Sequence, residues 1–282
     1  RVLTTADSLT YVKPDSAINL LKHLKTEMAH APEATQMYYR LLRIKANDKA
    51  YVTHTSDSAI LPIVAYYEKK SKSHLMEAYY YAGRVYSDLN DAPQALSYFQ
   101  KAAEASQGST DYRVISRIYS QIGELSLYQD IYDEALPAYR KAYQYNVLAK
   151  DSTGLVLNLR DIAWNYTALN KADSSLHYYK SAYALAKKLN NQQYMDAVQG
   201  ELADLYIQLK KYDEARKALH NSLNGAKKVM SQDAFFATTS RFYYQIGALD
   251  SASYYSSRII KEHHTIYAQQ TAHWILAQIA EQ

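Results

Sequence analysis

The sequence predicts an all-α fold, a right-handed solenoid of antiparallel helix pairs with a period of about 40 residues. Two observations lead to this prediction. Glycine (7) and proline (5) are scarce in a chain of 282 residues, whereas a β-sheet protein needs many turns built from them. In addition, small and aromatic residues recur at spacings that place them on one face of an α-helix. We therefore expect about fifteen helices and no sheet.

The recurring pattern is a small residue, then an aromatic residue or leucine four positions later and a second small residue seven positions later. The first small residue of each copy, here called the anchor, is Ala17, Ala59, Ala95, Ala135, Ser175, Ala215 or Ala252. The anchors from Ala95 to Ala215 are equally spaced along the chain. An aspartate two residues before most anchors suits the start of a helix, where it can accept hydrogen bonds from unpaired backbone N–H groups. Each anchor thus marks the first turn of a helix.

A second pattern lies twelve residues before the anchors and predicts the first helix of each pair. It is a small residue followed three positions later by tyrosine, as in Gly83 with Tyr86 and Ser240 with Tyr243; Gly123 is followed by Ser126 instead. No proline closes the repeats, so we expect the helices to run into long turns between pairs.

These residues resemble the tetratricopeptide repeat family. The positions that carry the resemblance are Gly83, Tyr86, Ala95, Phe99, Ala102, Gly123, Ala135, Tyr139, Ala142, Ala163, Tyr166, Tyr179, Ala182, Ala203, Tyr206 and Ala215. The family period is about 34 residues, so each helix should be about one turn longer. We expect degenerate helix pairs of the same solenoid over 1–75, repeats over 76–260 with anchors Ala95, Ala135, Ser175, Ala215 and Ala252, and the first helix of an incomplete pair over 261–282.

The helix after Tyr267 is expected to leave an apolar face without cover in this chain. Trp274, Ile275 and Ile279 exceed what packing against the preceding helices requires. A solenoid end needs a polar outer face, so we expect Trp274 and Ile279 to be exposed or covered by a further segment.

Several kinds of chemistry are excluded or disfavoured, and we expect neither an enzyme nor a cofactor. The absence of cysteine excludes disulfides, thiolate catalysis and cysteine-type zinc sites. There is no phosphate-binding glycine loop, no zinc-protease helix and no nucleophile elbow. Glu262-His263-His264 comes nearest to a metal site, but adjacent histidines on a helix point about 100° apart.

The charge pattern argues against nucleic-acid binding by this chain. Its 32 basic and 28 acidic residues are interspersed and give a net charge of +4, whereas nucleic-acid binders concentrate positive charge on one face. No apolar run approaches the ~20 residues that span a bilayer. Tyrosine is abundant, with 30 residues. Doublets such as Tyr178-Tyr179 could stack sugars, but packing between helices is the preferred interpretation.

The family resemblance implies a concave surface lined by the first helix of each pair. Carried over residue by residue, it comprises Tyr80, Arg84, Arg117, Glu124, Tyr128, Arg160, Trp164, Asp204, Gln208, Arg241 and Tyr244. Two interpretations of the arginines stay open. Arg84, Arg117 and Arg160 could bind carboxylates of an acidic partner, or could pair with Glu77, Glu124 and Asp161.

The N-terminal segments 6–9, 14–18 and 54–58 resemble exported tetratricopeptide proteins of Bacteroides-type bacteria. That resemblance implies a signal peptide, a lipoprotein on the periplasmic face of an envelope membrane, and membrane association through segments outside this chain. A cytoplasmic location is the alternative. The function expected is a non-catalytic scaffold that binds a protein or peptide in the concave groove. The alternative function is the extracytoplasmic sensor domain of a membrane-bound regulator whose output segment lies beyond residue 282.

Overall fold

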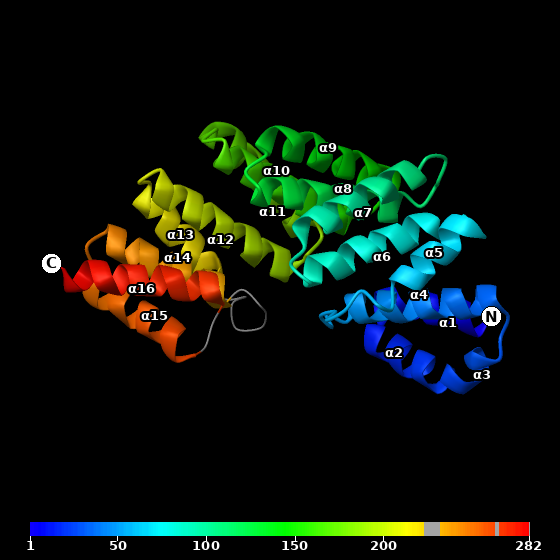
Figure 1. Cartoon of the computed structure of the whole chain (residues 1–282). Coiled ribbons are helices and arrows are strands. Elements are labelled where there is room, and N and C mark those ends of the chain that lie inside the picture. Colours follow the sequence, from blue (N-terminus) through cyan, green and yellow to red (C-terminus); the bar gives the residue numbers. More distant parts are fainter. Residues whose placement is uncertain (223–231, 263–264, 282) are drawn as a thin grey trace. The chain divides into compact units, whose positions relative to one another are not determined.

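The computed structural model describes residues 1–222, 232–262 and 265–281, in which α-helix is the only regular secondary structure. The chain divides into two compact units, Arg1–Ala149 and Lys150–Gln282 (Figure 1). The helices of the first unit are α1 (Val2–Val12), α2 (Pro14–His23), α3 (Lys25–Ala29), α4 (Glu33–Lys49), α5 (Leu61–Lys69), α6 (Leu75–Asp88), α7 (Ala92–Ala105), α8 (Tyr112–Tyr128) and α9 (Tyr132–Leu148). Those of the second are α10 (Ser152–Ala168), α11 (Ala172–Lys188), α12 (Gln192–Gln208), α13 (Tyr212–Ser222), α14 (Gln232–Gln245), α15 (Leu249–Lys261) and α16 (Ile266–Ala280).

Within each unit, consecutive helices form the expected antiparallel pairs. The tightest are α6 with α7 and α8 with α9 in the first unit, and α10 with α11, α12 with α13 and α14 with α15 in the second (Figure 1). The described residues contain sixteen helices rather than about fifteen, because the five-residue α3 follows α2 as a separate segment. The helices α8 to α12 have 17 residues each. This length explains why the repeat is longer than the usual period of the family.

The anchors occupy a constant place in the second helix of each pair. Six of them are the fourth residue of their helix and are completely buried: Ala17, Ala95, Ala135, Ser175, Ala215 and Ala252. The prediction for Ala59 is wrong, because Ala59 is exposed in the turn before α5. The larger residues Ile60 and Ile63 are buried there instead. The small-residue pattern therefore does not extend to α5.

The small residues of the first helices let an aromatic ring approach the helix backbone. A Cβ atom added at Gly83 would lie 2.5 Å from the ring of Phe99, and one at Gly123 would lie 2.8 Å from the ring of Tyr139. Both rings are buried. In these two helix pairs, a buried ring packs directly against a glycine, and this contact determines how closely the two helices approach each other.

The expectation of long turns between pairs is wrong for two connections, whereas the one between α13 and α14, 223–231, lies outside the described residues. Only 149–151 separates α9 from α10, and only 189–191 separates α11 from α12. A residue with positive φ reverses the chain in each, at Lys150 (φ 53°) and Asn190 (φ 51°). A single left-handed residue therefore ends these helices without proline.

The helix-capping prediction is also corrected. The acids before the anchors lie inside the first turn, where they face the positive end of the helix dipole, and the N-cap of α9 is Ile131. The side chains that do cap belong mainly to first helices. Asp111, Asp151 and Asn191 accept hydrogen bonds from the backbone N–H of Val114, Gly154 and Tyr194, at 3.2, 3.0 and 3.1 Å. These three caps recur with the same spacing as the anchors.

We expect the substitution Asn191→Ala to lower the free energy of unfolding by about 0.5–2 kcal/mol, because it removes a cap without changing the charge. Asp133→Ala, in the first turn of α9, is the matched control and should cost less than about 1 kcal/mol. Urea denaturation of both variants measures the difference. Equal losses would show that the acids before the anchors also act as caps.

Tyrosines supply much of the core. Tyr81, Tyr139 and Tyr179 are among the largest completely buried side chains. The packing interpretation is confirmed for the doublet at 178–179: Tyr179 is buried, and Tyr178 stacks on Tyr166 of the paired helix.

The last helix packs on one side only. Ala272 and Ile275 of α16 are buried in the contacts that α16 makes with α14 and α15. Trp274 is 51% exposed and Ile279 is partly exposed, as expected for an uncovered face. No helix in the described part of the chain is both long and apolar enough to cross a membrane.

Candidate partner-binding surface

In the first unit, side chains of the three first helices α4, α6 and α8 form a polar network. We call it the first-helix surface, and it comprises Lys45, Asp48, Lys49, Glu77, Tyr80, Arg84, Arg117, Gln121 and Glu124. Its hydrogen bonds and ion pairs join helices that are far apart in the sequence. The network has two centres, one at Lys45 and one at Asp48.

Lys45 of α4 forms ion pairs with both α1 and α6. Its side chain is only 3% exposed, and its Nζ lies 2.7 Å from Asp7 Oδ1 and 2.8 Å from Glu77 Oε1. Burial alone would raise the pKa of Glu77, but the contact with His74 Nδ1 and the charge of Lys45 outweigh it and lower that pKa to about 2. Burial alone would lower the pKa of Lys45, yet the two carboxylates raise it. Lys45 and Glu77 are therefore both ionised at neutral pH, and this centre is structural.

Asp48 is the second centre, and cations outnumber carboxylates around it. Its Oδ1 accepts a hydrogen bond from Arg84 Nε at 2.7 Å, and its Oδ2 accepts one from Lys49 Nζ at 2.8 Å. Burial, Arg117 and Arg84 together lower the pKa of Lys49, although Asp48 acts in the opposite direction. Burial is the largest cause of this lowering, and the positive charges of Arg117 and Arg84 add to it. An additional anion would be stabilised here.

Arg117 and Arg84 extend the network across α8. The Arg117 guanidinium lies 5.1 Å from the ring centroid of Tyr11, which also receives Lys45 Nζ at 4.7 Å. Arg84 Nη1 donates to Gln121 Oε1 at 2.7 Å, and Gln121 Nε2 donates to Glu124 Oε2 at 2.7 Å. Arg84 thus pairs with Asp48 rather than with Glu77.

The two tyrosines expected on this surface differ in exposure. Tyr80 is only 4% exposed, and its ring meets Tyr81 edge-on at 5.0 Å. Tyr128, the last residue of α8, is 65% exposed. Tyr80 therefore acts as packing beneath the charged network, whereas Tyr128 is accessible.

In the second unit, the expected residues form two separate ion pairs. Arg160 donates to Asp161 Oδ1 through Nε at 3.1 Å and Nη2 at 2.7 Å, which is the pairing that the sequence left as an alternative. Asp204 accepts from Gln208 Nε2 at 3.0 Å and forms an ion pair with Arg241.

The aromatic residues expected in the second unit are half-buried. Trp164 of α10 and Tyr244 of α14 are both partly exposed. The ring of Tyr244 meets that of Trp274 at 5.5 Å in an edge-to-face arrangement. The sequence predicted only the exposure of Trp274. Its contact with Tyr244 follows from the packing of α16 on α14.

The sequence analysis missed Lys45, Asp48, Lys49 and Tyr11, which lie before residue 76 in the part that matches the repeat loosely. One signal was available. Lys45, Asp48 and Lys49 are spaced so that they share one face of a helix. The clustering of opposite charges on that face could have placed them on a common surface.

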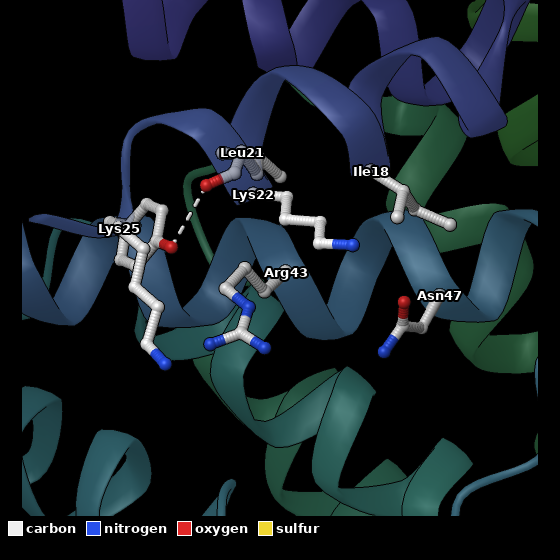
Figure 2. Close-up of a pocket in the computed structure, with 7 residues that line it drawn as sticks. Ile18, Leu21, Lys22, Lys25, Arg43 and Asn47 are labelled. Atoms are coloured by element: carbon white, nitrogen blue, oxygen red, sulfur yellow. Dashed lines mark hydrogen bonds between the residues drawn. The ribbon is translucent and has the colours of Figure 1, made fainter.

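A pocket on the other side of α4 also gathers positive charge. It lies between α2 and α4, has a volume of about 250 Å³, and is lined by Ile18, Leu21, Lys22, Lys25, Tyr39, Arg43 and Asn47 (Figure 2). Tyr39 closes one end by donating a hydrogen bond to the carbonyl oxygen of Leu21 at 2.9 Å. Arg43 and Lys45 are two residues apart on α4, or roughly 200° around the helix. This pocket is therefore separate from the first-helix surface.

Nothing in the described residues suggests a metal centre. No group of histidine and carboxylate side chains there could hold a metal ion. Glu262 forms an ion pair with Arg258 at 2.8 Å, whereas His263 and His264 of the weak metal candidate lie outside the described residues.

Comparison with known proteins supports the fold and assigns no family. No protein-family model and no curated protein matches the chain. Among solved structures, the apo quorum sensor NprR from B. thuringiensis superposes with a TM-score of 0.75 at 15% identity, covering 98% of this chain and 79% of NprR. NprR in complex with its cognate peptide NprX gives a TM-score of 0.75 at 16% identity, with coverages of 98% and 81%.

Two further structures extend the likeness. Apo RapI has a TM-score of 0.74 at 13% identity, covering 92% of this chain and 75% of RapI. A signal transduction ATPase from Pyrococcus horikoshii, described as having a tetratricopeptide repeat sensor, gives a TM-score of 0.68 at 12% identity and covers 99% of this chain and 41% of that protein. At these identities the likeness shows the fold alone. It confirms the predicted class, a tetratricopeptide-like solenoid of antiparallel helix pairs.

Proposed function

We propose that this chain is a non-catalytic scaffold that binds an acidic peptide or protein segment on the side of the solenoid formed by the first helices. The cluster of cations at Asp48 carries the proposal. Lys49 and Arg84 pair with this buried carboxylate, and the charge of Arg117, from the next first helix, acts on Lys49. A carboxylate supplied by a partner would relieve the repulsion among them.

The fold agrees with this proposal. NprR, which shares the fold, has been solved with its cognate peptide. Stacked helix pairs expose an extended surface that suits a peptide chain. The choice of an acidic partner rests on the residues of this chain and not on that likeness.

The test compares two charge reversals of equal size. Peptides are selected from a random library on the wild-type protein and measured against Arg117→Glu and Arg43→Glu. We expect the selected peptides to be rich in Asp and Glu, to bind at least about ten-fold more weakly to Arg117→Glu, which corresponds to ~1.4 kcal/mol, and to bind Arg43→Glu nearly normally. Circular dichroism and thermal unfolding confirm that both variants fold. Equal weakening by both variants would indicate bulk charge attraction and reject the site.

The exported, membrane-associated location remains part of the proposal, as does the sensor alternative. The full-length gene distinguishes the two functions. A transmembrane helix followed by a cytoplasmic segment supports the sensor domain, and a lipoprotein signal without such an output segment supports the scaffold. An enzyme is not proposed.

A further inference from the structure

Three repeats share a stacked tyrosine pair. In each, the tyrosine three residues after the small residue of the first helix lies face to face with the tyrosine three residues after the anchor. The pairs are Tyr86–Tyr98 (centroids 5.4 Å apart, 10° between planes), Tyr166–Tyr178 (5.4 Å, 18°) and Tyr243–Tyr255 (5.6 Å, 5°). The near-identical geometry in three repeats shows that the second helix places a ring at a defined position, where it stacks on the tyrosine of the first helix. We call this position the seat.

One repeat keeps the first ring and lacks the second. Tyr206 occupies the first position on α12, but the partner position on α13 is Ala218. The repeat of Gly123 lacks both rings, with Ser126 and Ala138, so no ring there is left without a partner. Among these five repeats, only that of Tyr206 therefore has a tyrosine at the first position and none at the partner position.

An open pocket lies at this seat. Its volume is about 270 Å³, and its walls include Tyr206, Ala218, Leu202, Tyr183, Lys180 and Lys217. These residues belong to α11, α12 and α13, three helices of the second unit that Figure 1 labels. A cavity of about 150 Å³ accommodates benzene, whereas binding sites for small molecules measure about 300–1,000 Å³. The pocket therefore fits one aromatic ring better than a whole cofactor.

We infer that this pocket docks one tyrosine side chain of a protein partner, which stacks on Tyr206 as Tyr178 stacks on Tyr166. Lysines at its rim suit such a ring. In the Tyr86–Tyr98 pair, Lys101 Nζ lies 5.0 Å from the centroid of Tyr98, and Lys180 and Lys217 are available for the same contact.

The site does not depend on the proposed function. Asp204, which belongs to the expected partner-binding residues, and Tyr206 are two residues apart on α12, or roughly 200° around the helix. Arg117 belongs to α8 and is not among the residues that line this pocket. Arg117→Glu therefore changes none of its walls, and each site can fail without the other.

The test follows the methyl NMR signals of Leu202, which lines the pocket and is retained in every variant. The probe is N-acetyl-tyrosinamide, which carries a tyrosine side chain between two peptide groups, and the control is N-acetyl-leucinamide. We expect a saturable shift with the first at millimolar concentration and none with the second. Ala218→Tyr should abolish the shift and raise Tm, because its ring fills the seat.

Two further variants keep the proposal falsifiable if Ala218→Tyr folds poorly. Tyr206→Leu removes the stacking face and should abolish the shift at Leu202. Tyr178→Ala empties the seat beside Tyr166 and should create a second tyrosinamide site there. The proposal is overturned if Leu202 shows no saturable shift, if leucinamide binds equally well, or if Tyr206→Leu binds like the wild type.

Discussion

Replacing Lys45 by methionine is expected to destabilise the first unit by roughly 3–5 kcal/mol, the usual cost of removing one partner from a buried ion pair. Lys45 is 3% exposed and lies between Asp7 and Glu77, which would both lose their cation. Hydrogen exchange of the α4 and α6 amides measures the loss locally, as suits an array whose repeats contact mainly their neighbours.

The matched control is Lys70→Met. Lys70 and Glu33 also form an ion pair at 2.7 Å, but their side chains are 57% and 54% exposed. An exposed ion pair contributes little to stability, so this variant should resemble the wild type. Equal losses in the two variants would show that the burial of Lys45 is not the reason why its ion pairs stabilise the fold.

The ion pair between Lys45 and Glu77 also leads to a prediction of how the stability of the protein varies with pH. The pKa of Glu77 is about 2 in the folded protein and 4.5 in its ordinary state. A lowered carboxylate pKa contributes stability above the unfolded pKa, and this contribution is lost as the pH falls from about 4.5 towards 2. Its size is on the order of 3 kcal/mol. In Lys45→Met this acid-dependent loss should shrink, whereas a loss identical to that of the wild type would exclude Glu77 as its source.

Replacing Phe99 by alanine should cost about 3–5 kcal/mol, because it removes a completely buried ring from the contact between α6 and α7. Gly83→Ala alone should cost about 1–3 kcal/mol through overpacking, since its Cβ would meet that ring at 2.5 Å. Combined with Phe99→Ala, however, Gly83→Ala should become neutral or stabilising. The clash is then gone and alanine favours the helix by about 0.5–1 kcal/mol.

Gly200→Ala is the control for this double-mutant comparison of Gly83 and Phe99. The nearest atom to a Cβ there is Ser222 Oγ, at 3.8 Å, an ordinary contact distance. Within α12 this substitution should therefore stabilise the protein by about 0.5–1 kcal/mol. Thermal unfolding of the single and double variants provides the comparison. Additive effects of Gly83→Ala and Phe99→Ala would contradict the ring-on-glycine contact.

Local sequence determined the fold class and the place of most second helices. A buried small residue such as Ala135, with Tyr139 and Ala142 on the same helical face, is a local constraint that recurs with the repeat. The expected concave residues were assigned by family resemblance. The structure shows that Arg84 and Arg160 are already engaged within the chain, by Asp48 and Asp161.

The remaining features were decided by tertiary structure. Lys45 and Glu77 meet although 32 residues separate them, and no local spacing encodes that distance. The pocket beside Tyr206 arises from a ring that is absent at Ala218 and becomes visible only when paired helices bring the two positions together. Helix periodicity can be recognised from the spacing of residues over a few turns of one helix. Buried ion pairs, and a pocket left by a missing ring, depend instead on which helices pack against each other.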